Sequence, residues 1–579
     1  MFNPLDALKL VERNPEDLIQ VSYADSWFKS RQLKHQNSEN VSLEVYKPYD
    51  WTYTSRYKGT MIKVDDGISW IQDQDGSHAI PLDKLTSNNP IKFYDDMILY
   101  EDELGDNGIS IKRKLAVVGS GPSAFYTVLN ILKEKPNDFE IDMFERNPSP
   151  FGLVRYGVAP DHPEVKNCID RFNDVAEFIP TGAFKYYGNV SVSDPDNHHE
   201  RKPQLTLKDL YKNYNGVLYA YGSSSANVPE LAGIEHPAVI DSFSFVGWYN
   251  GYPKHQKLKV PLEKVENVTI IGNGNVAIDI IRVLLAPPTQ HWAKTDISKA
   301  AFEVLKASKV KNINVVARRG VLESKFTNKE LRELLEMDKV GVYFSGWNSD
   351  EFKDELKETK LDRINKRRVS LLDKYIGKYP EDQLRDPKAR TWNLQYLKSP
   401  IGVKVKDDDL LSETIFSVNK KVKSAESGKW EIQPAGKITS VPNELLILAT
   451  GYKCGPLSEF EELHIPFEKG RILNDNGKVA GVENSYCVGW VANGSTGNIN
   501  STVVDSMNVS STIVNDMCND GDSEVKKGRE GIEELLQQKG IRSVTWNDWN
   551  KIHEREIVDG SKAKKPYEKM TFKKMLEAV

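Results

Sequence analysis

The chain has few cysteines, and none of them stands in a chemically diagnostic pattern. The four cysteines among 579 residues are Cys168, Cys454, Cys487 and Cys518. No pair has the C-x-x-C spacing of a redox disulfide, a zinc ribbon or a protein-held iron–sulfur cluster. We therefore expect buried or inert thiols and no metal site. Two alternatives depend on such cysteines: a thioredoxin-reductase-like disulfide enzyme, and an electron-supplying amidotransferase subunit with its own cluster.

Long apolar runs and an excess of one charge are also missing. No apolar run approaches the ~18 residues that cross a bilayer. The formal net charge is −5, with 28% charged residues. Such a balance creates no general field that would attract nucleic acid, so no nucleic-acid partner is expected.

The first twenty residues lack the composition of a mitochondrial presequence. Such a presequence is rich in Arg and Ser and poor in acids. This segment contains Asp6, Glu12, Glu16 and Asp17. We expect no targeting peptide at this end of the sequence.

Two glycine-rich turns are the main feature that is present. Residues 119–124 read Gly-Ser-Gly-Pro-Ser-Ala after the apolar run 115–118, and residues 272–277 read Gly-Asn-Gly-Asn-Val-Ala after the run 268–271. Each predicts a strand, a tight turn and a helix start, where backbone N–H groups meet a pyrophosphate. One such motif is a weak signal, but two predict an α/β fold with two Rossmann-like domains. The expected cofactor contacts are Gly119, Gly121, Ser123, Ala124, Gly272, Asn273, Gly274, Asn275 and Val276.

The residue after the next predicted strand indicates which ribose each site accepts. Glu145 closes the stretch 139–145, where an acid is expected to bind a ribose hydroxyl. The second motif leads instead to Arg318 and Arg319, and paired arginines suit a 2′-phosphate. We therefore expect FAD at the first site and NADP at the second. A chain with both would pass a hydride from NADPH to a flavin.

Beyond the first motif, the sequence resembles the adrenodoxin reductase family, the mitochondrial-type NADPH–ferredoxin reductases. The resemblance is carried by residues 150–167, 187–192, 245–251, 318–320, 326–333, 449–453, 489–490 and 494–499, and it extends from about 114 to 579. It implies a flavoprotein that passes electrons from NADPH through FAD to a ferredoxin- or adrenodoxin-type iron–sulfur protein. It also implies a place in the mitochondrial matrix and raises peripheral association with the inner membrane.

The resemblance implies roles for particular residues. Trp490 and the turn 497–499 would return late in the chain to the flavin ring, and Gly497 would lie where flavin and nicotinamide meet. At 492–499 the chain reads Ala-Asn-Gly-Ser-Thr-Gly-Asn-Ile, where the family often has basic residues before the first glycine. The implied cofactor contacts beyond the two turns are Glu145, Leu153, Val192, Trp490, Gly497, Asn498, Ile499, Arg318, Arg319 and Glu330. The implied catalytic residues near the rings are His162, Asp279 and Glu333.

Some of these residues also have purely structural interpretations. Thr327-x-x-Glu330 ahead of apolar positions is a capping box. His162 lies in a loop where a histidine is often simply solvated, and Asp279 lies one turn into a predicted helix. Both interpretations of each residue stay open at this point.

A basic cluster suggests where an acidic ferredoxin would dock. In the family, basic residues at about these positions bind the iron–sulfur protein, and a solvated basic face is the alternative. Overall acidity does not exclude such a patch, because steering depends on local potential. The cluster consists of Arg332, Arg363, Lys366, Arg367 and Arg368.

The first ~110 residues resemble a different family. Residues 6–9, 47–60 and 91–104 are similar to the TIPRL family, which binds catalytic subunits of type 2A phosphatases in TOR signalling. The similarity ends near 108–110, so the segment would hold only part of a β-rich domain. We expect weak or absent phosphatase binding and favour a chimera over a genuine fusion. A phosphatase-regulator fusion in TOR signalling is the alternative function.

The expected domain order combines these segments. The partial TIPRL-like segment covers 1–110, and the FAD-binding domain covers 113–225 and resumes at 445–579 with the C-terminal tail. The NADP-binding domain, 226–444, is inserted between the two parts. The reacting rings would meet between these domains.

Overall fold

The computed structural model describes residues 112–193, 204–425, 428–497, 499–519 and 525–579, together with five strands nearer the N-terminus. The chain divides into two compact units, Met1–Ser110 and Ile111–Val579. The five strands of the first unit form an antiparallel sheet in the order β1-β2-β3-β4-β5. They are β1 (Lys29–Asn37), β2 (Asn40–Tyr46), β3 (Gly59–Asp65), β4 (Ile68–Asp73) and β5 (Gly76–Pro81). The described part of this segment is β-rich, as predicted.

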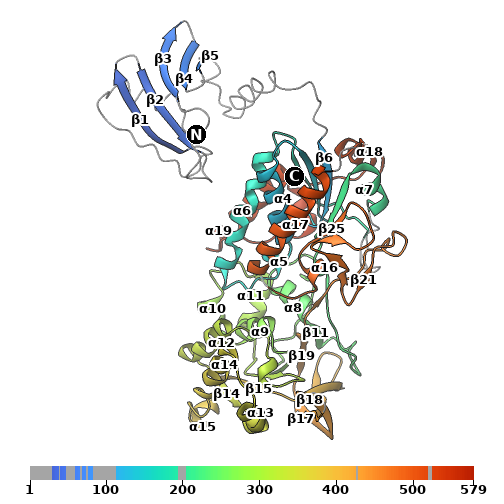
Figure 1. Ribbon diagram of the computed structural model, residues 1–579. Helices are drawn as coiled ribbons and strands as arrows, with labels where there is room; N and C mark the ends of the chain where they lie inside the picture. The colour runs from blue at the N-terminus through green and yellow to red at the C-terminus, as the bar shows by residue number, and fades with distance from the viewer. Residues whose placement is uncertain are drawn as a thin grey trace. The chain divides into compact units, whose positions relative to one another are not determined.

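The second unit begins with a seven-stranded sheet in the order β23-β24-β25-β9-β6-β7-β8 (Figure 1). Its central strands are parallel and buried on both faces, which explains the apolar runs 115–118 and 216–219. Helices α4, α17 and α19 pack in one apolar cluster against the sheet, and α7 and α18 pack in a second cluster. The strands are β6 (Arg113–Val118), β7 (Phe139–Phe144), β8 (Phe184–Tyr187), β9 (Gly216–Tyr219), β23 (Asn474–Asp475), β24 (Lys478–Val479) and β25 (Ser485–Cys487). The helices are α4 (Pro122–Glu134), α7 (Leu207–Asn213), α17 (Ile499–Asn519), α18 (Arg529–Gln538) and α19 (Trp546–Ser561).

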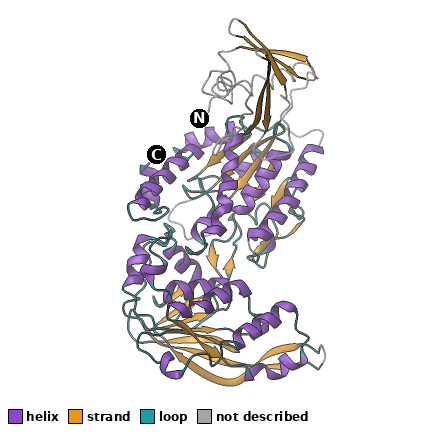
Figure 2. Cartoon of the chain, turned by 90° about the vertical axis from the view of Figure 1, so that its left-hand side faces the viewer, coloured by secondary structure: helices purple, strands orange, loops and turns teal. Residues whose placement is uncertain are grey.

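A second, wholly parallel sheet has the order β11-β19-β12-β13-β15-β14. Figure 2 shows it with helices around it, as a second lobe of this unit. Its strands are β11 (Val239–Asp241), β12 (Asn267–Ile271), β13 (Asn312–Val316), β14 (Val342–Trp347), β15 (Arg390–Gln395) and β19 (Leu445–Leu448). Its helices include α8 (Ser242–Tyr249), α9 (Asn275–Leu285), α10 (Pro288–His291), α11 (Lys299–Lys306), α12 (Asn328–Leu335), α13 (Lys353–Glu358), α14 (Arg363–Asp373) and α15 (Glu381–Leu384).

Strand β19 shifts the proposed boundary of the NADP domain. The prediction placed residue 445 and everything after it in the FAD domain, but β19 pairs with β11 on one side and β12 on the other. Its apolar residues 445–448 are fully buried because they occupy the interior of the second sheet. The inserted unit therefore includes Leu448.

The two crossings between the sheets run side by side. The chain leaves the first sheet through β10 (Ser225–Ala226) and returns through β20 (Tyr452–Lys453), and these two short strands pair antiparallel. The pairing ties both connections together at one place between the lobes. A crossing of this kind makes the second lobe an insertion into the first lobe.

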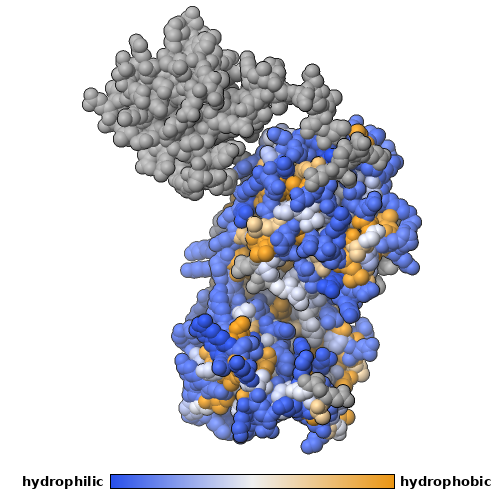
Figure 3. All heavy atoms as spheres, in the orientation of Figure 1, coloured by the Kyte–Doolittle hydropathy of each residue, from blue (hydrophilic) through white to orange (hydrophobic). Residues whose placement is uncertain are grey.

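A three-stranded antiparallel sheet packs beside the second parallel sheet. It consists of β16 (Lys398–Val405), β17 (Leu411–Lys423) and β18 (Trp430–Pro442). The remaining elements are short: α5 (Gly152–Tyr156), α6 (Cys168–Phe172), α16 (Trp490–Asn493), α20 (Phe572–Glu577), β21 (Phe467–Glu468), β22 (Arg471–Ile472), and the 3₁₀ turns η1 (Pro163–Asn167), η2 (Asn173–Phe178), η3 (Val321–Glu323), η4 (Glu336–Val340) and η5 (Asp350–Phe352). Among the described helices, none is both long enough and apolar enough to span a bilayer. On the face drawn in Figure 3, hydrophilic residues dominate the described surface and apolar ones form separate patches.

Candidate functional site

The first glycine turn has the geometry of a phosphate-binding turn. Gly119 adopts φ 103°, and a Cβ there would lie 2.6 Å from Cα of Tyr221, so a side chain cannot fit. Gly121 caps α4 without any side-chain hydrogen bond, and a Cβ there would meet nothing within 4 Å. The backbone N–H groups at the start of α4 are therefore accessible to an anion.

Glu145 follows β7 and lies beside this turn. Its carboxylate accepts hydrogen bonds from Ser120 Oγ (2.6 Å) and the backbone N–H of Asn147 (2.9 Å). Burial raises the pKa of Glu145, and the hydrogen bond from Ser120 works in the opposite direction. The side chain is thus held in one orientation at the sheet edge where a ribose would lie.

The second turn repeats this geometry in the inserted unit. A Cβ on Gly272, at φ 115°, would lie 2.1 Å from the carbonyl oxygen of Ala449. Asn273 Nδ2 donates to Ser324 Oγ (3.0 Å), and Asn275 Oδ1 accepts from the backbone N–H of Thr327 (2.8 Å). The two asparagines therefore fasten the turn to the loop that leads into α12.

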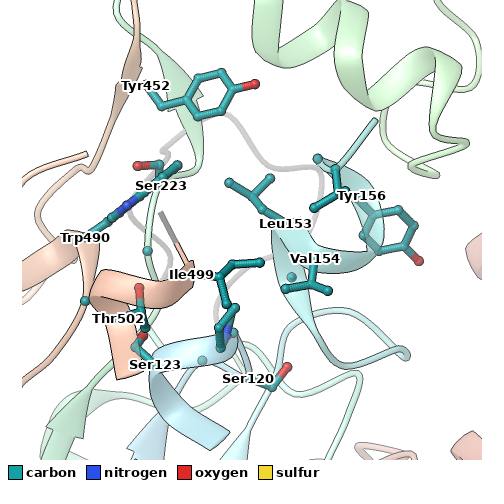
Figure 4. A pocket seen from close by; sticks show the side chains of 18 of the residues that line it. Ser120, Ser123, Leu153, Val154, Tyr156, Ser223, Tyr452, Trp490, Ile499 and Thr502 are labelled. Carbon is teal, nitrogen blue, oxygen red and sulfur yellow. The ribbon is translucent and has the colours of Figure 1, made fainter. Parts of the chain in front are cut away.

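A cavity of about 910 Å³ extends from the first turn to Asn275 and Val276, at the start of the helix that follows the second turn. Its walls come from both lobes, and Figure 4 shows Leu153 pointing across it toward Ser223 and Trp490, with the ring of Tyr156 turned the other way. The predicted residues that line it are Gly119, Gly121, Ser123, Glu145, Leu153, His162, Val192, Asn275, Val276, Asp279, Glu330, Trp490 and Ile499. Lining residues not predicted as site residues include Ser120, Tyr156, Ser223, Phe243, Tyr252, Tyr452 and Thr502.

Several predicted contacts lie elsewhere. Ala124 is fully buried in the apolar cluster under α4, so it serves helix–sheet packing and does not line the cavity. Gly272, Asn273, Gly274 and Gly497 do not line the cavity either. Asn498 lies outside the described residues.

The late segment reaches the first turn through close packing. A Cβ on Gly489 would lie 2.5 Å from Ser123 Oγ, and Ser506 Oγ on α17 donates to the carbonyl of Ser123 (3.2 Å). This packing brings Trp490, which begins α16, onto the cavity wall. The return of a late segment to the first turn agrees with the predicted discontinuous domain.

Arg282 organises a polar network at the cavity wall. Its guanidinium donates to Asp161 (2.9 Å), Asp279 (2.8 Å) and Glu330 (3.2 Å). It also donates to His162 Nδ1 at 2.9 Å. One arginine therefore faces three carboxyl groups and one imidazole, and acids outnumber it.

The network fixes the orientation of His162. Since Nδ1 accepts from the permanently charged Arg282, the proton of a neutral ring lies on Nε2 and is donated to Glu333 (3.0 Å). His162 is 9% exposed, so the solvated-loop interpretation is wrong. Glu333 contacts His162 but does not line the cavity.

Glu330 forms only half of the expected capping box. Thr327 Oγ1 accepts from the backbone N–H of Glu330 (3.2 Å), as in an N-cap. The Glu330 carboxylate accepts instead from Arg282. One nitrogen of His162 and carboxylate oxygens of Glu330 and Glu333 lie within 4.8 Å of one another, a grouping that could hold a cation. Arg282 already donates to Glu330 in this grouping, and the expectation of no metal stays a prediction.

Asp161 and Asp279 have opposite pKa shifts. Burial would raise the pKa of Asp161, yet hydrogen bonds from His291 and Arg282 hold it well below its usual range. Burial raises the pKa of Asp279 to about 7, with Arg282 opposing and Glu330 reinforcing the shift. The pKa values of two carboxyl groups that contact the same arginine thus differ widely. Asp279 is the one able to exchange a proton near neutral pH.

Asp279→Asn is expected to change the pH dependence of stability. The folded protein holds a proton on Asp279 that the unfolded chain, with an ordinary pKa near 3.8, releases. Between about pH 4 and 7 the folded state therefore binds more protons, and this contribution to stability is lost as pH rises. Thermal unfolding from pH 4 to 8 should show a slope of stability against pH that is more positive in the variant, by at most about 1.4 kcal/mol per pH unit. Parallel pH profiles for the two proteins would contradict this assignment.

The arginine pair lies at the end of β13. Arg318 and Arg319 are both exposed, while Gly320 beside them is buried. Neither lines the cavity, which ends at residues 327–330 in this lobe. Their proposed contact with a 2′-phosphate therefore concerns the outer, adenosine end of the coenzyme.

Arg368 does not belong to the predicted docking cluster. Arg332, Arg363, Lys366 and Arg367 are exposed, but Arg368 is 5% exposed. Its guanidinium donates to the carbonyls of Val321 (3.4 Å) and Phe326 (3.2 Å) and lies over the Phe326 ring. A side chain used inward in this way cannot bind a partner.

Arg282 and Asp161 are the functional residues that sequence reasoning missed. Arg282 stands three residues after Asp279, so both share one face of a helix, and this spacing was an available signal. Asp161 adjoins His162, but its contact with α9 depends on the packing of the two lobes. No local pattern predicts such a contact.

Comparison with known proteins identifies two relationships. Residues 1–121 match the family model "TIP41-like family". The chain is 34% identical to the probable mitochondrial NADPH:adrenodoxin oxidoreductase of Saccharomyces cerevisiae, over 81% of this chain and 97% of that protein. It is 35% identical to the human mitochondrial NADPH:adrenodoxin oxidoreductase, over 79% of this chain and 90% of that one. The solved structure of Mycobacterium tuberculosis FprA in complex with NADPH matches with a TM-score of 0.71 and 30% identity, over 81% of this chain and 99% of that chain.

Proposed function

Since the chain belongs to the NADPH:adrenodoxin oxidoreductase family, we propose that the cavity between its two lobes is the site of the family's reaction. The protein is a flavoprotein oxidoreductase that passes electrons from NADPH through FAD to a ferredoxin- or adrenodoxin-type protein. One observation carries the assignment of the site: a single cavity extends from the first glycine turn to Asn275 and Val276, which begin the helix after the second turn. The relatives are mitochondrial by name, and we propose the same location for this chain.

The residues present fit FAD at the first turn. Gly119 allows the tight turn, Gly121 leaves room for a pyrophosphate at the start of α4, and Glu145 is oriented for a ribose. When bound, FAD accepts a hydride and releases electrons singly. Leu153, Trp490 and the other apolar wall residues would exclude water around the ring system.

The second lobe supplies the coenzyme contacts. Asn275, Val276 and Glu330 line the end of the cavity nearest the second turn, where a nicotinamide would enter. We propose that Asp279 holds an exchangeable proton at this wall, and that His162 and Arg282 orient it. Glu333 would act only through His162.

The direct test is spectroscopic and kinetic. The purified chain should show flavin absorbance and reduce a [2Fe–2S] ferredoxin with NADPH, and much more slowly with NADH. A colourless protein, or one without coenzyme preference, would contradict the proposal.

The exposed basic residues of α14 are the proposed docking surface. Arg363, Lys366 and Arg367 project from one helix, which packs against α12 through the hydrogen bond of Asn328 Nδ2 to the carbonyl of Ile364 (3.1 Å). Arg332, on α12, is also exposed. Local positive potential of this kind speeds association with an acidic protein.

Reversing the charge of Arg363, Lys366 and Arg367 is expected to slow ferredoxin reduction and to flatten its salt dependence. A loss of about tenfold or more at low salt is reasonable, since steering changes on-rates by 10–10³. NADPH oxidation with ferricyanide should be unchanged. The matched control reverses three exposed lysines: Lys406 in the turn after β16, and Lys420 and Lys437 on the three-stranded sheet. Equal slowing with both acceptors would show that α14 serves the fold or the coenzyme site.

The N-terminal segment suggests a second candidate function. Its match to the TIP41-like family model supports an interaction role, and we propose that phosphatase binding by it is weak or absent. The described cavity residues all lie beyond residue 112, in the other compact unit. Any phosphatase role would therefore be separable from the reductase.

Deleting residues 1–110 is expected to leave flavin content and NADPH oxidation nearly unchanged. The deletion stops short of β6, which starts at Arg113, so the first parallel sheet is kept whole. Flavin absorbance per chain and kcat/KM for NADPH are the measurements. Loss of FAD on truncation, or tight capture of a type 2A phosphatase by the full chain, would establish a working two-function protein.

A further inference from the structure

We propose that Lys421, on β17, is a specificity-determining residue that acts by position: it holds the loop carrying Arg318 and Arg319 and so sets the preference for NADPH over NADH. The inference rests on the proposed function, because it assumes that these arginines bind the 2′-phosphate. Lys421 lies about a hundred residues later in the sequence, on the antiparallel sheet beside the coenzyme lobe.

A chain of hydrogen bonds connects Lys421 to the arginine loop. The backbone N–H of Gly320, directly after Arg319, donates to Glu323 Oε2 at 2.9 Å. The other oxygen of Glu323 accepts from Lys421 Nζ at 2.7 Å. Lys421 also donates to Glu355 on α13. Lys421 thus lies between two carboxylates, one of which closes the turn that follows the arginine pair.

Packing brings the same groups into contact. A Cβ on Gly320 would lie 2.7 Å from Cε1 of Phe352 and 3.0 Å from Nζ of Lys421. The side chains of Lys421 and Glu355 are 3% and 5% exposed. The backbone of the arginine loop therefore rests directly on a buried lysine, and only glycine fits at position 320.

Two further side chains hold the loop backbone. Asn419, two residues before Lys421 on the same strand, donates from Nδ2 to the carbonyl of Arg318 (3.3 Å). Arg368 donates to the carbonyls of Val321 and Phe326. The backbone is fixed while both arginine side chains remain exposed, which is the arrangement that pre-orients charged groups for a ligand.

The charge balance makes Lys421 critical. Burial raises the pKa of Glu355, and the hydrogen bond from Lys421 opposes that shift. Without the lysine, Glu355 is left buried and unpaired and Glu323 loses its anchor, so the turn at Gly320 is no longer held. Displacement of the arginine pair should lower kcat/KM for NADPH. It should not lower kcat/KM for NADH, which has no 2′-phosphate for these arginines to bind. The ratio of kcat/KM for NADPH to kcat/KM for NADH is therefore the quantity that should change.

Lys421→Met is the test, with kcat/KM for NADPH and NADH measured on the flavin-loaded protein with ferricyanide. The NADPH/NADH ratio should fall at least about tenfold, the effect of one charge-assisted hydrogen bond, mainly through a higher KM for NADPH. Lys421→Arg should restore most of the ratio. The matched control is Lys423→Met, because Lys423 on the same strand pairs with Glu358 of the same helix (2.8 Å) but both are half-exposed. It should leave the ratio unchanged.

A second variant tests the same connection in case Lys421→Met does not fold. Glu323→Gln removes the partly exposed end of the connection, and it should lower the ratio in the same direction. An unchanged ratio in both variants, or equal losses for the two coenzymes, would overturn the role of Lys421. Failure of the proposed function is distinguishable: in that case the wild-type protein itself shows no NADPH preference, or Arg318 and Arg319 can be replaced without effect.

Discussion

Replacing Arg318 and Arg319 together by glutamine is expected to weaken the preference for NADPH over NADH by about two to four powers of ten. Each charge-assisted hydrogen bond to a phosphate contributes roughly 1.5–3 kcal/mol, and a factor of ten corresponds to about 1.4 kcal/mol. Both side chains are exposed just after β13, in the position that Glu145 occupies after β7 in the first site. NADH lacks the phosphate, so its kcat/KM should change little.

The measurement is kcat/KM for both coenzymes with one small electron acceptor. A control that also removes two positive charges from the same lobe is Arg385→Gln with Lys388→Gln, since both residues are exposed. That control should lower kcat/KM only slightly for either coenzyme, through the general field. If the arginine variant behaved like the control, the 2′-phosphate would have to bind elsewhere.

The features that the sequence predicted well are local ones. Gly119, Gly272 and Glu145 could be found because a strand, a turn and a helix start follow one another within about thirty residues. The steric need at both glycines is confirmed by the contact that a Cβ would make. A family resemblance added His162 and Asp279, which indeed line the cavity.

Residues whose role depends on distant packing were harder to predict. The charge pattern alone groups Arg368 with the exposed basic residues before it. Leu372, one turn later on the same face of α14, is buried, and so is Arg368. Periodicity could therefore have separated Arg368 from its neighbours. No such signal exists for Lys421, because Glu323 and Glu355 approach it from separate segments. A domain boundary at residue 445 likewise assigns β19 to the wrong lobe, since a short apolar run can fill either parallel sheet.

A buried carboxylate contributes to the contact between the two lobes. Asp296, between α10 and α11, accepts hydrogen bonds from Lys166 (2.6 Å) in the first lobe and from Tyr567 (2.7 Å) and Lys569 (2.8 Å) in the C-terminal segment. Burial would raise the pKa of Asp296, but Lys569 and Lys166 hold it well below its usual range. Burial lowers the pKa of Lys569 to about 8. Two lysines thus share one carboxylate, and Lys569 is the one that burial disfavours as a cation.

Asp296→Asn is therefore expected to destabilise the protein by about 3–5 kcal/mol, because it leaves two buried lysines without a counter-charge. Lys569→Met should cost much less, since Lys166 still balances Asp296. The pH dependence separates the two lysines further. Between about pH 8 and 10.5 the unfolded chain binds a proton that the folded Lys569 has lost, so this contribution to stability rises with pH. Lys569→Met should lack that rise.

Urea unfolding at pH 7 and 9.5, followed by tryptophan fluorescence, measures both effects. Lys562→Met is the control, because Lys562 forms an exposed pair with Asp559 in the same C-terminal segment (2.6 Å). Exposed pairs contribute ~0–1 kcal/mol, so this variant should unfold almost as the wild type does. Asp296→Asn proving no less stable than Lys569→Met would show that the carboxylate is not the centre of this contact. In that case the packing of Tyr567 and its neighbours, rather than charge, would hold the coenzyme lobe against the flavin lobe.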